Sequence, residues 1–305
     1  MAMTPPFPPL AELHRHLDGS MRQETLHDLA REQGREIPGE LGFWPGVGLQ
    51  AALAQFEITL SVLQQPAAVE RVASEMCEDA EREGITTLEI RFAPQLHREA
   101  SIASIVDAAV AGAAGRAGII LCGLYGEPPD LLFELVEVAS SRPGVVGLDL
   151  AGGPGPAHEW SMADYEPAFS RARSLGIGRT VHAGEDHRPP SEIRMAIEVL
   201  HAQRIGHGIS LLEDPSVVGL VLERGVTIEA CPTSNHQTGS IASVAEHPIR
   251  QWMERGIPVS VCTDNTLLSR VDLPGELRRV MDEAGVDRAG IETCIAAGQA
   301  AAFRR

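Results

Sequence analysis

Short apolar runs rich in β-branched residues alternate along the chain with longer stretches in which apolar residues recur at helical spacing. The stretch 66–84 shows the helical pattern, because Val69, Val72 and Met76 lie three and four residues apart with Glu and Arg at other positions. Gly84 is expected to end this helix, since glycine readily adopts the left-handed conformation of a helix C-cap. A strand-like run follows directly.

The same pattern predicts eight strands separated by helical sequence. The predicted strands are 11–17, 85–93, 118–125, 145–151, 178–183, 203–209, 226–231 and 258–263. Strands that alternate with helices form parallel sheets with right-handed crossovers. Eight such units predict an α/β fold, a closed (β/α)8 TIM barrel with extra helices after the first strand. An open doubly wound sheet is the alternative, but no Gly-rich dinucleotide-binding turn follows the first strand.

The length of 305 residues fits one barrel domain over 1–305, because α/β barrels of this size occur as single domains. No linker, repeat or low-complexity tract divides the chain. With 44% apolar and 22% charged residues, the composition is that of a globular protein with a large core.

The formal net charge of −17 argues against nucleic acid and anionic membranes as partners, because an acidic surface repels both. The opening MAMTPPFPPL has neither the basic segment nor the apolar run of a signal peptide, and we expect a cytoplasmic protein. Five cysteines without a Cys-x-x-Cys pair are expected to be reduced core thiols.

The carboxyl ends of barrel strands are where barrel enzymes build their active sites. The first predicted strand ends with His14 and His16, whose side chains share one face because they are two residues apart. A lone His-x-His pair is more often structural than metal-binding. The interpretation of this pair therefore depends on what the other strands bring beside it.

Later strands end in further candidate groups. The fifth ends in TVHAGED with His182 and Glu185, the sixth in RIGHG with His207, and the eighth in VCTDN with Asp264. Barrel closure would place the eighth strand beside the first, although an Asp at a strand end often only caps the next helix. Imidazoles with one carboxylate are ligands that zinc prefers, so we expect a metal site.

The remaining histidines are assigned no role, because most lie in predicted helices or loops where solvated or packed histidines are ordinary. They are His27, His97, His158, His187, His201, His236 and His247. The sequence has no His-Glu-x-x-His helix, no cytidine-deaminase pattern of His-x-Glu with Pro-Cys-x-x-Cys, and no Gly-x-Ser-x-Gly elbow.

Seven short motifs, ELHRHLDGS, LEIRFAP, GLDLAG, HAGE, RIGHG, CPTSN and TDN, follow one another across nearly the whole chain. In this order they resemble the adenosine deaminase family of metal-dependent amidohydrolase barrels. The resemblance implies one Zn²⁺ ion with a bound water or hydroxide. Its implied ligands are His14, His16, His182 and Asp264.

The resemblance also implies roles in catalysis and substrate binding. Glu185 would protonate a ring nitrogen, and His207 would orient or deprotonate the zinc-bound water. Asp264 would be a catalytic residue as well as a ligand, and His16 would also contact the substrate. Asp18 and Gly152 match positions that touch the ribose hydroxyl and the purine ring. The substrate would be a purine nucleoside, and the sequence is silent on the oligomeric state.

Three charges within apolar strands have two open interpretations. Glu229, Asp149 and Glu89 either contact site histidines or form buried structural ion pairs. Asn235 is expected to shape the loop after the seventh strand.

The chain departs from the family pattern at the eighth strand. Many members read Thr-Asp-Asp-Pro where this chain has Asn265 and Thr266 after Asp264. An acid donates a hydrogen bond to a purine nitrogen only when protonated, whereas the Asn265 amide donates while neutral. We therefore expect purine recognition to persist.

Two further departures suggest a roomier mouth. The loop AGGPGPAHEW over 151–160 is rich in Gly and Pro, and Ala52 stands where relatives often carry an aromatic residue, although Leu53 and Phe56 remain. These changes leave N6-substituted adenines and aminodeoxyfutalosine open as substrates besides adenosine.

The leading interpretation is zinc-dependent hydrolytic deamination of adenosine or a close 6-aminopurine nucleoside, with release of ammonia. One alternative is another hydrolysis on the same metal site, since fold does not fix substrate. The other is an inactive nucleoside-binding relative. The presence of all four metal ligands with Glu185 and His207 counts against a pure binder, which needs no activated water.

Overall fold

The computed structural model describes residues 7–39, 41–152 and 159–303. Its eight strands are parallel and neighbour one another in chain order. They are β1 (Leu10–His16), β2 (Ile85–Phe92), β3 (Gly118–Leu124), β4 (Val145–Ala151), β5 (Gly178–Ala183), β6 (Arg204–His207), β7 (Thr227–Ala230) and β8 (Val259–Val261). All eight predicted strands are confirmed, with ends that differ by at most two residues.

The barrel closes between β8 and β1. The amide of His16 donates to the carbonyl of Asp264 over 2.8 Å, and the amide of Asp264 donates to the carbonyl of His14 over 2.9 Å. This closure confirms the (β/α)8 barrel and rules out the open doubly wound sheet. It also brings Asp264 to the histidines of the first strand, as the sequence predicts.

Among the seven ladders that join consecutive strands from β1 to β8, the one between β4 and β5 has the fewest paired residues. Only two residue pairs join them, Gly147 with Gly178 and Leu148 with Arg179. Beyond these pairs, the hydroxyl of Tyr125 donates to the carbonyl of His182 over 2.8 Å. The Tyr125 side chain therefore satisfies a carbonyl of β5 beyond the last residue pair of β4 and β5.

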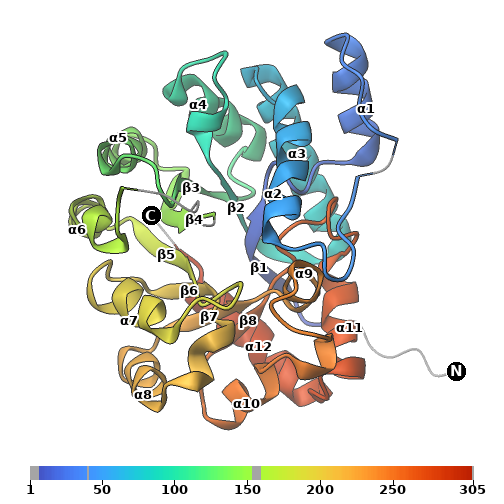
Figure 1. The fold of residues 1–305 in the computed structure, drawn as a ribbon. Coiled ribbons are helices and arrows are strands. Elements are labelled where there is room, and N and C mark those ends of the chain that lie inside the picture. Colours follow the sequence, from blue (N-terminus) through green and yellow to red (C-terminus); the bar gives the residue numbers. More distant parts are fainter. Residues whose placement is uncertain (1–6, 40, 153–158, 304–305) are drawn as a thin grey trace, which may run out of the picture.

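Helices surround the barrel (Figure 1). They are α1 (Gln23–Glu32), α2 (Leu49–Val62), α3 (Pro66–Glu83), α4 (Ile102–Ala113), α5 (Pro129–Ser140), α6 (Glu166–Ser174), α7 (Pro190–Glu198), α8 (Pro215–Arg224), α9 (Pro232–Thr238), α10 (Ile249–Glu254), α11 (Leu273–Glu283) and α12 (Arg288–Ala301). Short 3₁₀ segments cover Pro94–Leu96, Met162–Tyr165, Ile209–Glu213 and Val244–Glu246. Gly84 ends α3 with φ 82°, as predicted.

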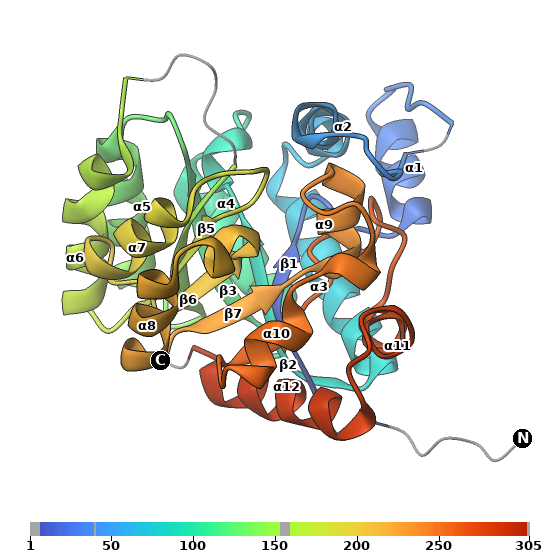
Figure 2. The ribbon, with the colours of Figure 1, turned by 60° about the horizontal axis from the view of Figure 1, so that its bottom comes forward.

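The two ends of the barrel are covered differently. In Figure 2, α12 crosses one end, whereas α2 and α9 lie toward the other. Helices α1 and α2 are the extra helices predicted after the first strand. All five cysteines are buried and none forms a disulfide. Within the described residues, no helix is both long and apolar enough to cross a lipid bilayer.

Candidate active site

A cavity of about 580 Å³ opens at the carboxyl ends of the strands. Its apolar wall includes Leu53, Phe56 and Leu60 of α2, and Ala52 also faces it. The sequence-predicted residues that line it are His16, Asp18, Gly152, His182, Glu185, His207, Asp264 and Asn265. His14 lies at the base of the same group with its side chain fully buried.

Ring nitrogens and a carboxylate converge on the cavity floor. The Nε2 atoms of His16 and His182 are 3.3 Å apart, and Asp264 Oδ1 lies 3.4 Å from His16 Nε2 and 3.6 Å from His14 Nε2. Donor atoms of His14, His16 and Asp264 lie within 4.8 Å of one another, and so do those of His14, His182 and His207. The structure thus brings all four predicted ligands together and adds His207 to the group.

These separations fit a shared cation. A tetrahedral zinc site with bonds of about 2.0–2.1 Å separates its ligand atoms by roughly 3.3 Å. His14 Nε2 is buried and has no hydrogen-bond partner among the described residues, which leaves its lone pair for an ion. The donor set of imidazoles with one carboxylate is suited to zinc.

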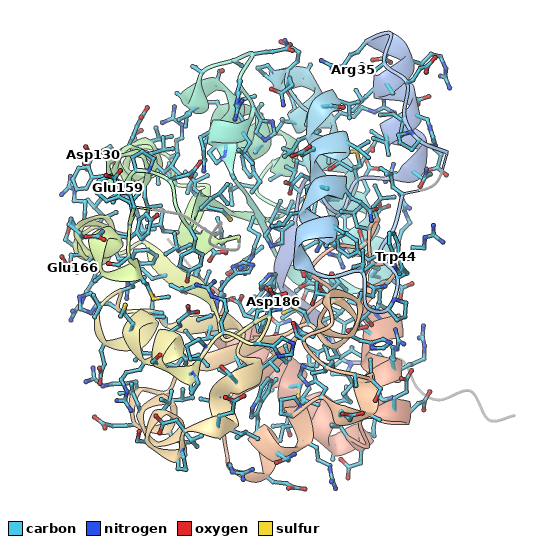
Figure 3. The ribbon with its side chains drawn as sticks, viewed as in Figure 1. Arg35, Trp44, Asp130, Glu159, Glu166 and Asp186 are labelled. Carbon is cyan, nitrogen blue, oxygen red and sulfur yellow. The ribbon has the colours of Figure 1, made fainter. Side chains whose placement is uncertain are left out.

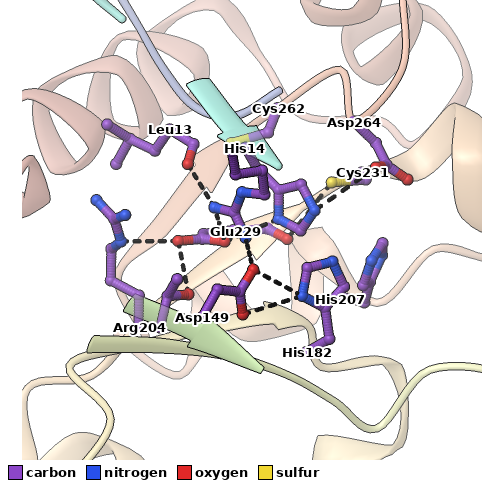
Figure 4. Close-up of polar contacts among 12 residues, drawn as sticks. Leu13, His14, Asp149, His182, Arg204, His207, Glu229, Cys231, Cys262 and Asp264 are labelled. Carbon is purple, nitrogen blue, oxygen red and sulfur yellow. Dashed lines mark hydrogen bonds and ion pairs between the residues drawn. The ribbon is translucent and has the colours of Figure 1, made fainter. Parts of the chain in front are cut away.

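Two buried carboxylates orient the imidazoles (Figure 4). Glu229 Oε2 lies 2.8 Å from His14 Nδ1, and Asp149 Oδ2 lies 3.1 Å from His182 Nδ1. Because carboxylates only accept, each Nδ1 carries the proton and each Nε2 is left to face the cavity floor. Arg91 bridges the two acids, 2.8 Å from Asp149 and 2.8 Å from Glu229.

The sequence left two interpretations open for the three acids within strands, contact with a site histidine or a buried ion pair. Two of the three acids do both. Glu229 and Asp149 contact site histidines and also belong to a buried ion-pair network with Arg91. Glu89 instead pairs with Arg204 at 2.5 Å and has no hydrogen bond or ion pair to a site histidine. Burial alone would raise the pKa of Glu229, but the charges of Arg91 and Arg204 outweigh it and hold that pKa below its usual range.

Glu185 lines the cavity beside His207. Its Oε2 lies 3.5 Å from His207 Nε2. Burial and the neighbouring Asp264 charge raise the pKa of Glu185 to about 7. A carboxyl group with a pKa near neutrality can donate and accept protons at physiological pH.

His207 is held neutral and fixed from behind. Burial lowers its pKa to about 4, and its Nδ1 lies 3.0 Å from Asn235 Nδ2. Ser234 donates to Asp264 Oδ2 over 2.6 Å. The sequence assigned Asn235 only to loop shape and did not assign Ser234, because a polar residue after a strand carries no signal of which group it meets.

The short helix α9 that carries Ser234 and Asn235 is anchored by α11. Glu276 of α11 accepts a hydrogen bond from the amide of Thr233 over 2.7 Å and a second one from its hydroxyl. Burial raises the pKa of Glu276 to about 7. A buried acid thus caps the helix that supports Asp264 and His207.

Two site residues adopt a backbone conformation that favours glycine. His207 has φ 67° and Asp264 has φ 63°. Non-glycine residues in this region cost about 1–3 kcal/mol each and persist where the surroundings enforce them. β6 ends at His207, and Asp264 follows the last residue of β8 by three positions; both left-handed residues line the cavity.

The residues expected to bind substrate lie on the cavity wall with unsatisfied polar atoms. Asp18 Oδ1 and Asn265 Oδ1 are buried and have no hydrogen-bond partner among the described residues. Burial and the Asp264 charge raise the pKa of Asp18 to about 7. Gly19 leaves room for the Asn265 side chain, because a Cβ there would lie 1.8 Å from Asn265 Oδ1 and would displace it.

The rim of the cavity is described in part. Gly152 lines it with φ 76°, but 153–158 of the Gly/Pro-rich loop, and His158 with them, lie outside the described residues. The view with side chains in Figure 3 shows Asp186, directly after Glu185, near the centre of the barrel mouth. Among the histidines without an assigned role, His97 and His247 are packed in the interior.

Comparison with protein families identifies relatives over nearly the full chain. The model of the family described as adenosine deaminase matches residues 9–304. An adenosine deaminase of Clostridium perfringens is 35% identical over 299 residues, which cover 92% of this chain and 89% of that protein. A probable adenosine deaminase of Dictyostelium discoideum is 39% identical over 90% of this chain, although the match spans only 38% of that longer protein.

Solved structures share the fold. The adenine deaminase of Arthrobacter aurescens superposes with a TM-score of 0.86 at 24% identity, covering 98% of this chain and 94% of that chain. A zinc-bound amidohydrolase of the cog1816 group superposes with a TM-score of 0.84 at 22% identity, covering 97% and 86% of the two chains. The family match and the identities to curated relatives carry the assignment beyond the fold. This chain belongs to the adenosine deaminase family, and is by that membership a deaminating hydrolase that acts on C–N bonds.

Proposed function

We propose that this protein catalyses the zinc-dependent hydrolytic deamination of adenosine or a close 6-aminopurine nucleoside, with release of ammonia. The observation that carries the proposal is the convergence of imidazole nitrogens and the Asp264 carboxylate on a cavity floor, beside Glu185, whose pKa is raised to about 7. Metal-dependent chemistry is a property of the family to which the chain belongs.

The proposed ligands of the ion are His14, His16, His182 and Asp264. Their support is the separation of their donor atoms and the unpartnered Nε2 of His14. When bound, zinc lowers the pKa of a coordinated water to about 7 and so supplies hydroxide at neutral pH. The network of Glu229, Asp149 and Arg91 keeps the ligands oriented.

Residues of the chain donate and accept the protons of the reaction. Attack of the water oxygen on the carbon that bears the amine moves electrons onto the adjacent ring nitrogen, and Glu185 gives that nitrogen its proton. His207, neutral and held by Asn235, accepts or orients the proton of the attacking water. His207 passes the proton of the water to the amine, which leaves as ammonia, and Glu185 takes up the proton of the new hydroxyl group, so that the product is the 6-oxo purine.

Substrate contacts follow from the unpartnered groups on the wall. We assign Asp18 to a ribose hydroxyl, and Gly152 and Asn265 to the purine ring. We also assign His16 to substrate binding, on the same side of the site as Asp18. A 5′-phosphate near Asp18 would meet a carboxyl group and be repelled whenever that group is ionised. A nucleoside is therefore expected to be a better substrate than its 5′-monophosphate.

The test is turnover of a substrate panel by zinc-loaded protein. Adenosine, N6-methyladenosine, adenine and AMP are incubated separately, and ammonia release and the ultraviolet shift of the ring are followed. We expect adenosine to be deaminated faster than AMP, the activity to be lost on chelation, and zinc to restore it. Absence of ammonia with every compound, or full activity after complete removal of metal, would contradict the proposal.

The amide at position 265 gives a separate prediction about pH. Asn265→Asp introduces a group that donates to the purine only below its pKa, whereas the native amide donates at all pH values. The KM for adenosine should therefore rise by roughly tenfold from about pH 6 to about pH 9 in the variant relative to the native protein. If KM depends on pH in the same way in both proteins, the proposed hydrogen bond from position 265 to the purine is wrong.

A further inference from the structure

The chain folds back into the barrel at the end opposite the cavity. After α12, Phe303 lies with its ring centroid 3.6 Å from Arg204 Cζ. The amide of Phe303 donates to Glu89 Oε1 over 2.6 Å. The helix that delivers it crosses this end of the barrel in Figure 2.

Two strand glycines make the space for this ring. A Cβ on Gly178 would lie 2.2 Å from Phe303 Cγ, and a Cβ on Gly147 would lie 2.8 Å from Phe303 Cδ2. These glycines pair with each other across β4 and β5, and neither has the positive φ that would itself require glycine. Contact with the aromatic ring is therefore a reason for glycine at both positions.

The ring contacts a guanidinium that reaches the active site through one carboxylate. Arg204 Nη1 donates to the carbonyl of Ala301 over 3.1 Å, and Arg204 Nη2 lies 2.5 Å from Glu89 Oε2. On its other side, Arg204 Nε lies 2.7 Å from Glu229 Oε1. Figure 4 shows Glu229 between Arg204 and His14.

Glu229 is held at both oxygens. Its Oε1 meets Arg204 and accepts a hydrogen bond from Thr180 over 3.0 Å, while its Oε2 meets Arg91 and His14 at 2.8 Å each. Because the two oxygens belong to one rigid group, the contacts at Oε1 help to fix where Oε2 meets the imidazole. Arg204 in turn takes two of its contacts from the segment Ala301–Phe303.

We propose that Phe303 is a positioning residue for the metal centre, acting through Arg204 and Glu229 on His14. The ring and the adjoining carbonyl of Ala301 hold the Arg204 guanidinium against Glu229, and Glu229 holds the His14 ring with Nε2 toward the cavity. The catalytic consequence rests on the proposed function. The contacts that link Phe303 to His14 are all between residues of the chain and involve neither metal nor substrate.

The first test uses Phe303→Ala in the full chain, with Phe7→Ala as matched control. The Phe7 ring also lies over an arginine, with Arg288 Cζ 4.6 Å from its centroid, but Arg288 is the first residue of α12 whereas Ala301 is its last. We expect Phe303→Ala to lose bound zinc to a chelator roughly tenfold faster than the native protein, at a temperature where both are folded. Phe7→Ala should lose zinc at the native rate.

The second test displaces the ring without removing it. Gly178→Ala adds a methyl group where the ring lies, and should accelerate zinc loss as Phe303→Ala does. In a Phe303→Ala background the added methyl group no longer meets the ring, so the double variant should be no worse than Phe303→Ala alone. Additive effects, or native zinc retention in both single variants, would overturn the proposal.

The third readout needs neither metal nor substrate. A ring N–H donated to a buried carboxylate gives a downfield proton resonance, and the His14 Nδ1 proton should lose or shift this resonance in Phe303→Ala but keep it in Phe7→Ala. If the native protein neither binds zinc nor releases ammonia, the proposed function fails while this readout still decides the link. An unchanged resonance in Phe303→Ala would contradict the link even if the enzyme is active.

Discussion

Replacing Glu185 with glutamine lowers kcat by about 10³-fold while the zinc content stays native, because loss of a general acid typically costs this much. The glutamine has the shape of the native side chain and can still contact His207, but it has no proton of suitable acidity for the ring nitrogen. The native group has a pKa raised to about 7 by burial and by Asp264. Ammonia release measures kcat, and elemental analysis measures the zinc.

Glu127→Gln is the control for this substitution. Glu127 is a half-buried carboxyl group whose pKa burial also raises, but it contacts Gln95 and the amide of Leu124 rather than the histidine cluster. We expect its kcat to stay within a factor of about two of the native value, as expected for a change outside the proposed site. Native kcat in Glu185→Gln would remove Glu185 from the mechanism.

Glu229→Ala is expected to lower the free energy of unfolding by about 3–5 kcal/mol and to abolish stable zinc binding. The substitution leaves Arg91 and Arg204 buried with one carboxylate fewer, and it removes the acceptor for His14 Nδ1. Uncompensated buried charge is the dominant cost, because both guanidinium groups are almost completely shielded from water. Chemical denaturation gives the free energy, and elemental analysis gives the metal content.

An exposed glutamate provides the comparison. Glu254 forms a surface pair with Arg250 at 3.7 Å, and Glu254→Ala should change stability little because solvent screens such pairs. A Glu229→Ala protein with native zinc content and near-native stability would show that the buried network neither supports the fold nor orients His14.

The periodic parts of the structure could be predicted from the sequence. The alternation of short apolar, β-branched runs with helical sequence identified all eight strands, and the rule that barrel sites lie at strand ends then identified His14, His182, His207 and Asp264 as neighbours. Alternation along a strand fixes which face a side chain occupies. This is why two histidines two residues apart were expected to point into one site.

What the sequence did not give were the contacts between strands. Arg91 bridges Glu229 and Asp149 only because of the register and closure of the barrel, and no spacing within one strand encodes either. The helix α9 is a single short segment with no apolar period, so the partners of Asn235 and Ser234 were not predictable. Phe303 is a lone aromatic residue and shows no pattern at all.

The left-handed backbone at His207 and Asp264 sets a limit on how this enzyme can be made more robust. Glycine at either position would relax the local conformation. Selection for thermal stability alone would therefore favour glycine at these two positions. Each such gain would delete a side chain to which we assign a part in the proposed reaction. Thermostable descendants of this sequence should therefore be sought among positions remote from the ends of β6 and β8.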